Sequence, residues 1–187
     1  MINTTMSFFL RAKHWQLFLL LAVVPMVAEM AAALSMPMSL RSWNDFGPAG
    51  LLFVGATLFY MLCFLAWFWS LGSFLNSIVK PAFKLRTAFF YFSLIYSALY
   101  LPFFLAVFFD VRPATIAVLL PLHFLAMFCI FYLLRFVSKT LALAETGRPV
   151  SFYDYAGPFF LMWFYPVGVW IIQPRVNRLY AERRNSE

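Results

Sequence analysis

Four long apolar runs constrain this chain more than any other feature of its sequence. They cover residues 15–36, 48–72, 87–109 and 115–137, and each run holds 22 to 25 residues. A helix needs about 20 apolar residues to cross the roughly 30 Å hydrocarbon core of a bilayer. Backbone N–H and C=O groups find no water in lipid, so each run is predicted to be a helix. We therefore predict an all-α integral membrane protein built on a four-helix transmembrane bundle.

The composition also indicates that lipid is the solvent of this chain. Of its 187 residues, 64% are hydrophobic and 11% are charged, and the mean hydropathy is +0.84. Soluble domains carry about 25% charged residues. The longest hydrophilic stretch, residues 138–155, is too short for a soluble domain, so residues 1–187 are predicted to form a single membrane domain. The net charge of +7 flanks the apolar runs, which is typical of membrane anchoring and argues against nucleic acid as a partner.

A fifth apolar segment, residues 157–173, is shorter and carries its own helix breakers, Pro166 and Gly168. Proline removes a backbone donor and glycine permits a turn, so each half would reach only part of the way across. The segment could be a kinked fifth span or a re-entrant or interfacial helical hairpin. A basic tail, residues 174–187, follows it and contains four arginines.

The distribution of Lys and Arg favours the hairpin. If the fifth segment does not cross, twelve of the 14 cations lie on the side of both termini, and Arg41 and Arg112 lie on the other. Cations are enriched on the cytoplasmic side of membrane proteins. We therefore predict a short Pro/Gly-broken C-terminal hairpin, re-entrant or interfacial, with the N-terminus and the C-terminus in the cytoplasm.

Two stretches, KHWQLFLLL at residues 13–21 and WFYPVGVWIIQPRVNRLY at residues 163–180, carry a resemblance. They resemble the two ends of a group of small, uncharacterised bacterial integral-membrane proteins. The resemblance implies a multi-pass protein of the bacterial inner (cytoplasmic) membrane and implies no activity. In the predicted topology both stretches meet the cytoplasmic surface, where they define a candidate interface site: His14, Trp15, Gln16, Gln173, Arg175 and Asn177.

Polar residues inside the apolar runs define a second candidate site. Glu29 is the only acid well inside a predicted span, where an ionisable group costs at least about 2.5 to 3.5 kcal/mol at mid-bilayer. At 1.5 Å per residue, Glu29 and His123 lie about 10 and 12 Å from the outer ends of their helices, so they could pair. Ser93, Tyr96, Ser97 and Tyr100 share one helix face by their spacing. The predicted buried polar layer consists of Glu29, Thr57, Tyr60, Tyr96, Tyr100 and His123.

This layer has two interpretations, and the sequence leaves both open. Polar side chains bond across membrane helices simply to hold a bundle together, for about 0.6 kcal/mol each. Intramembrane ionisable residues also mark ligand sites and proton pathways. A protonated Glu29 bonded to His123 would suit either interpretation.

The remaining residues suggest no catalytic chemistry. Cys63 and Cys129 lie far apart in apolar runs, so they are predicted to pack rather than to form a disulfide or a zinc site. No catalytic motif is present, and no metal or cofactor is predicted. We expect a non-catalytic accessory or structural subunit of a larger membrane complex that contacts other subunits and, at its cytoplasmic face, anionic lipid headgroups. The alternatives are a small transporter or proton pathway through Glu29 and His123, and an intramembrane enzyme that acts on lipid.

Overall fold

A computed structural model of the protein describes residues 4–35, 47–107 and 112–186. Predictions that concern residue 36, Arg41, residues 108–109 and Glu187 lie outside the described residues. Over the described ranges the chain consists of helices and short connections, and it contains no strand. The all-α class is therefore confirmed.

Four helical segments are long and apolar enough to cross a membrane, which confirms the predicted transmembrane bundle. The first, His14–Ser35, contains a π-helical turn in its middle. The segments are α2 (His14–Phe18), η1 (Leu19–Val23) and α3 (Val24–Ser35) in the first span, followed by α4 (Gly47–Ile78), α5 (Ala88–Val107) and α6 (Pro113–Thr146).

Helices α4 and α6 continue past their predicted ends at residues 72 and 137. With 32 and 34 residues they extend about 48 and 51 Å, beyond a hydrocarbon core of about 30 Å. The sequence turns more polar there, but Ser138 and Thr140 stay buried, and their hydroxyl groups bond carbonyl groups of the same helix at 2.6 and 2.8 Å. Gly147 then ends α6 in the left-handed conformation, with φ of 61°.

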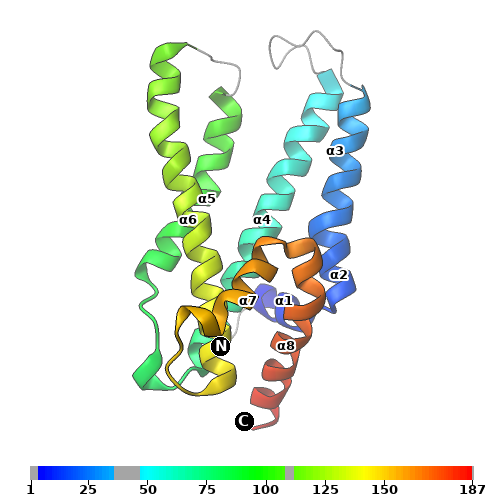
Figure 1. The fold of residues 1–187 in the computed structure, drawn as a ribbon. Coiled ribbons are helices and arrows are strands. Elements are labelled where there is room, and N and C mark those ends of the chain that lie inside the picture. Colours follow the sequence, from blue (N-terminus) through cyan, green and yellow to red (C-terminus); the bar gives the residue numbers. More distant parts are fainter. Residues whose placement is uncertain (1–3, 36–46, 108–111, 187) are drawn as a thin grey trace.

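The spans form two helix pairs, α3 with α4 and α5 with α6. Figure 1 shows that the pairs meet in the half of the bundle that holds α1, α7 and α8, here called the closed half. They diverge toward the other end, here called the open half, which holds residues 47–60 of α4 and 113–128 of α6. The largest fully buried side chains all belong to the closed half: Leu10, Leu17, Leu21, Trp67, Phe68, Leu71, Leu75, Phe90, Leu133, Phe136, Leu141 and Met162.

A short helix that the sequence analysis did not predict, α1 (Thr4–Arg11), precedes the first span. Phe9, Leu10 and Ala12 are buried, and α1 packs against α4 and α8. The apolar stretch from Phe8 to Leu10, directly before Arg11, is the sequence feature that indicates this helix. The stretch is too short to span a membrane, so a search for spanning segments does not detect it.

The C-terminal region is a helical hairpin, as predicted, formed by α7 (Phe152–Trp163) and α8 (Tyr165–Asn185). Figure 1 shows the hairpin against the closed half of the bundle, with both ends of the described chain at the same end. The hairpin is longer than the predicted segment 157–173. Most of the predicted basic tail belongs to α8, because Val176 is buried and the side chain of Arg175 pairs with Glu145 on α6.

The break of the hairpin lies at Phe164, not at Pro166 or Gly168. Pro166 falls in the first turn of α8, where a missing N–H costs nothing. Gly168 instead allows the two helices to approach closely, since a Cβ atom there would lie 1.7 Å from the carbonyl oxygen of Leu161. Pro166 and Gly168 therefore lie just after the turn of the hairpin, where Pro166 suits the start of α8 and Gly168 allows α8 to pack closely on α7.

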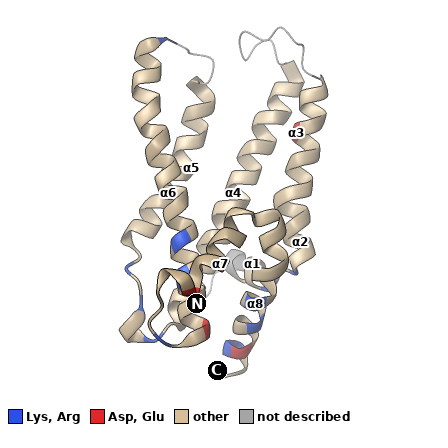
Figure 2. Cartoon of the chain, viewed as in Figure 1, with Lys and Arg blue, Asp and Glu red and all other residues tan. Residues whose placement is uncertain are grey.

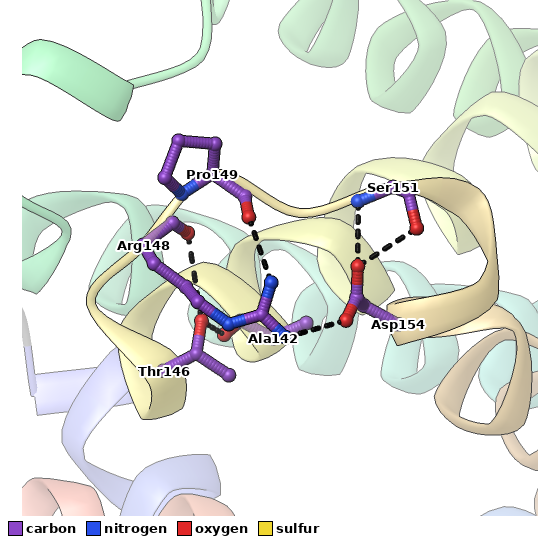
Figure 3. A network of polar contacts seen from close by, with 6 residues as sticks. All are labelled: Ala142, Thr146, Arg148, Pro149, Ser151 and Asp154. Carbon is purple, nitrogen blue, oxygen red and sulfur yellow. Dashed lines mark hydrogen bonds and ion pairs between the residues drawn. The ribbon is translucent and has the colours of Figure 1, made fainter.

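A small polar network fixes the connection from α6 to α7 (Figure 3). The backbone N–H and the hydroxyl of Ser151 donate to Asp154 at 2.7 and 2.8 Å, which forms a capping box at the start of α7. Arg148 donates to the other carboxylate oxygen of Asp154 at 2.8 Å and to the carbonyl of Pro149 at 3.2 Å. The N–H and hydroxyl of Ser151, together with Arg148, hold the pKa of Asp154 below its usual value.

Substitution of Gly168 tests the close approach of α7 and α8. Gly168→Ala is expected to lower the stability of the detergent-solubilised protein by roughly 1 to 3 kcal/mol, because the added methyl group overpacks the contact. Gly157→Ala is the matched control, since its Cβ would meet nothing within 4 Å. Thermal unfolding should show Gly157→Ala unchanged or more stable. Equal effects of the two substitutions would contradict the close approach.

Candidate functional site

The first part of the predicted polar layer lies between α3 and α4. The hydroxyl of Thr57 donates to Glu29 Oε1 at 3.2 Å and also to the carbonyl of Phe53 at 2.9 Å. Glu29, Thr57 and Tyr60 line a cavity of about 540 Å³ on this helix pair. Thr57 thus acts as the hydrogen-bond partner that a carboxyl group needs away from water.

The second part of the layer lies between α5 and α6. The hydroxyl of Tyr100 and Nδ1 of His123 are 2.8 Å apart, and the hydroxyl of Tyr96 donates to the carbonyl of Leu122 at 2.9 Å. Tyr100 and His123 line a cavity of about 500 Å³ that also reaches α4 and the turn of the hairpin. These bonds tie α5 to α6 within their pair.

The predicted layer is therefore divided into two groups. Glu29 is bonded to Thr57 and His123 to Tyr100, and the two ionisable residues line different cavities. The reason is that the helix pairs diverge at this level (Figure 1). Residue counting along the sequence gives the depth of a side chain along its helix but not the distance between the two helix pairs.

Tyr60 and Tyr165 line both cavities and so lie between them. Tyr165 is a site residue that the sequence analysis missed, because it stands at the start of α8 in the hairpin turn. Its ring lies 5.8 Å from that of Tyr60 and 5.7 Å from that of Phe64. The wall between the cavities is thus made by one residue of α4 and one of the hairpin.

The hydroxyl of Tyr165 also replaces a backbone hydrogen bond that is missing from the first span. Pro25 has no N–H, so the carbonyl of Leu21, four residues earlier, loses its usual helical donor. Tyr165 donates to that carbonyl at 3.1 Å. The π-helical turn η1 lies directly before this proline, as expected where the regular bonding pattern is interrupted.

The second candidate site is the interface site formed by the two stretches that carry the resemblance, residues 13–21 and 163–180. Its side chains are arranged around Gln173. This side chain is fully buried. It accepts a hydrogen bond from Trp67 Nε1 at 3.2 Å and donates to the carbonyls of Phe9 and Ala12 at 2.7 and 3.1 Å. The last carbonyls of a helix have no partner within it, so Gln173 caps α1 from a distant part of the chain.

Asn177 supports the same contact one turn further along α8. Its amide donates to the carbonyls of Leu10 and Ala12 at 3.3 and 3.2 Å. The ring of His14 lies 4.7 Å from that of Trp170. The two stretches that carry the resemblance are therefore packed on each other.

The other predicted interface residues have different roles. Gln16 accepts a hydrogen bond from the backbone N–H of Lys13 at 2.8 Å and so caps α2, and Trp15 is exposed. Arg175 forms a two-pronged ion pair with Glu145 of α6, with Nε 2.8 Å from Oε1. The interface site therefore has most of its polar groups engaged in holding helices together.

The described side chains include no group of three His, Cys, Asp or Glu residues that could hold a metal ion. Cys63 is half-buried and Cys129 buried, and both are free thiols. Comparison of the chain with protein-family models, with curated proteins and with solved structures finds no match.

Replacement of Gln173 by glutamate tests the cap of α1. Gln173→Glu keeps the size of the side chain but presents a carboxylate to the carbonyls of Phe9 and Ala12. We expect a loss of stability of roughly 1 to 3 kcal/mol at neutral pH, because a buried group loses its donor and gains repulsion.

The loss should shrink on acidification. Burial raises the folded-state pKa of the introduced carboxyl group above its unfolded value of about 4.3. The folded protein then carries the protonated form, which can donate, below this raised pKa, and the loss shrinks as the pH falls from the raised pKa toward about 4.3. Thermal unfolding of the variant and of the native protein at several pH values measures the difference. A difference that does not depend on pH would contradict the donor role of Gln173.

Proposed function

We propose that this chain is a small non-catalytic protein of the bacterial inner membrane and serves as an accessory or structural subunit of a larger membrane complex. The open half of the bundle carries this proposal. In residues 47–60 of α4 only Gly50 and Ala56 are buried, and in residues 113–128 of α6 only Ala126 is buried. Large apolar side chains of both pairs, such as Leu51 and Phe124, remain exposed.

A crevice between α4 and α5 in the open half suits a helix of a partner protein. Its volume is about 330 Å³, and its wall includes Gly47, Gly50 and Ala106, with Leu51 and Leu105 beside them. Helices associate in lipid through close packing rather than through the hydrophobic effect, and small residues allow that approach. The crevice has no charged lining residue, so a partner needs only an apolar transmembrane helix to enter it.

The transport alternative has less support. A proton pathway through Glu29 and His123 would have to pass Tyr60 and Tyr165, and each ionisable group already has a partner in its own helix pair. An intramembrane enzyme would rest on the same divided polar layer. The subunit proposal uses instead the exposed apolar side chains of the open half.

The proposed orientation places both termini in the cytoplasm. Figure 2 shows Lys and Arg gathered at the end of the bundle where the described chain begins and ends, and Arg112 stands at the opposite end, at the start of α6. Lys84, Arg86 and Arg135 are exposed in the closed half. Cations in this position match a cytoplasmic surface and would attract anionic lipid headgroups.

Site-specific photocrosslinking in membranes of the native host tests the subunit proposal. A photoreactive phenylalanine analogue in place of Leu51 or Ala106 should give one discrete protein adduct, because both positions line the crevice. Leu99 and Phe160 are matched controls, since they are exposed but do not line the crevice. Electrophoresis and mass spectrometry identify the products.

The controls should give only lipid adducts. A missing protein adduct at the crevice positions, or the same adduct at all four positions, would sink the proposal. A product with twice the mass of the chain would also sink it, because the occupant would then be a second copy.

Cysteine labelling tests the orientation. Cys63 and Cys129 are first replaced by alanine, and single cysteines are then placed at Ser186 and at Ala114, which lie at opposite ends of the bundle. A membrane-impermeant maleimide should label intact cells at position 114 and should label position 186 only after permeabilisation. The reverse pattern would show that the termini face outward.

A further inference from the structure

The cavity of about 500 Å³ beside His123 has the features of a ligand site, independently of the proposed function. Its walls come from α4, α5, α6 and the hairpin of α7 and α8, and it is open on one side, where His123 is exposed. Its volume lies within the roughly 300 to 1,000 Å³ of typical small-molecule sites. Met61, Met127 and Met162 contribute to its wall, and flexible thioether side chains adapt to irregular apolar ligands.

The lining of the cavity favours an uncharged ligand. No Asp, Glu, Lys or Arg lines it. An ion in such a site would lose its hydration without gaining a counter-charge. The ligand should therefore be a neutral molecule with a large apolar part.

Ser97 supplies the observation that points to a ligand. It is 3% exposed and lines the cavity, and its hydroxyl is the one buried side-chain oxygen or nitrogen among the described residues that lacks a hydrogen-bond partner. Comparable hydroxyls on Ser70, Ser93 and Ser138 bond the carbonyl four residues earlier. Most buried polar atoms in proteins are hydrogen-bonded, and a bound ligand would supply the acceptor that this hydroxyl lacks.

Ser97, Tyr100 and His123 form a polar group where α5 meets α6. Ser97 and Tyr100 are three residues apart on α5, so they share a helix face, and Tyr100 is bonded to His123. Tyr60 and Tyr165 add two further hydroxyl groups to the lining. A ligand with one polar end would place that end beside this polar group and its apolar part among the methionines.

We propose that this cavity binds a neutral lipid whose carbonyl oxygen accepts a hydrogen bond from Ser97 and whose hydrocarbon chain lies along Met61, Met127 and Ile130. An acylglycerol ester and an alkyl quinone share this chemistry. Tyr100 and His123 border the head of the ligand and restrict its orientation.

Equilibrium binding to the full chain in detergent micelles tests this proposal with three radiolabelled probes of equal chain length. The probes are a monoacylglycerol, an alkyl benzoquinone and an alkane without oxygen. We expect saturable one-to-one binding of the monoacylglycerol or the quinone, which tells the two sources apart. Ala126→Phe is a variant whose larger side chain fills the cavity. The alkane should bind the native chain no better than it binds this variant.

Ser97→Ala should weaken binding roughly two- to tenfold, the effect of one hydrogen bond. Ser93→Ala is the matched control, one turn away on the same helix, with its hydroxyl bonded to Phe89 and outside the cavity. It should bind like the native protein. Thermal unfolding shows that each variant is folded, and Ser97→Ala should be at least as stable as the native chain.

The proposal is overturned if neither oxygen-containing probe binds, or if the alkane binds as tightly as both. It is also overturned if Ser97→Ala and Ser93→Ala have equal effects on affinity. If Ala126→Phe does not fold, Met127→Trp provides a second variant that narrows the cavity, and unchanged binding to that variant would count against this location.

Discussion

Carbonyl groups without a donor in their own helix determine how the closed half of this bundle is arranged, because lipid cannot supply the missing hydrogen bond. Helix α1 ends near Arg11, and Gln173 and Asn177 provide donors to its last carbonyls. The carbonyl of Leu21, which Pro25 leaves without its usual donor, is bonded by Tyr165. All three donors belong to α8, so these bonds fix the position of that helix and, through the tight turn at Phe164, the position of α7.

The turn of the hairpin contacts both helix pairs. The two pairs are held together along the bundle only as far as this turn. Tyr165 packs on Tyr60 of α4, and Trp163 packs on Phe131 of α6 with ring centroids 4.6 Å apart. Beyond the turn no element of the described chain fills the space between the pairs, and they diverge (Figure 1). Both cavities lie at this level, since Tyr165 lines each of them. The cavities are thus a consequence of a hairpin that stops partway along the bundle.

The sequence predicted the features that depend on composition and charge, namely the four spans and the C-terminal hairpin. It also indicated that Gln173, Asn177 and His14 lie close together, because topology alone brings the two ends of the chain to the same side, while their location at a membrane surface stays a prediction. The separation of Glu29 from His123 could not be predicted in this way, because residue counting gives the depth of a side chain but neither the rotation of its helix nor the divergence of the two helix pairs. Tyr165 was missed for a related reason: its role depends on the turn at Phe164, whereas the sequence placed the break at Pro166 and Gly168.

The same physics indicates which part of the cavity at Ser97 determines its selectivity. In a bilayer the hydrocarbon tail of a ligand is surrounded by lipid before it binds, so entry into an apolar cavity gains contact packing but little hydrophobic free energy. A polar group differs, because it finds few partners in the hydrocarbon core. The hydroxyl of Ser97 and the Tyr100–His123 pair offer such partners where α5 meets α6. Selection among membrane lipids would therefore depend on these few polar atoms rather than on the much larger apolar surface.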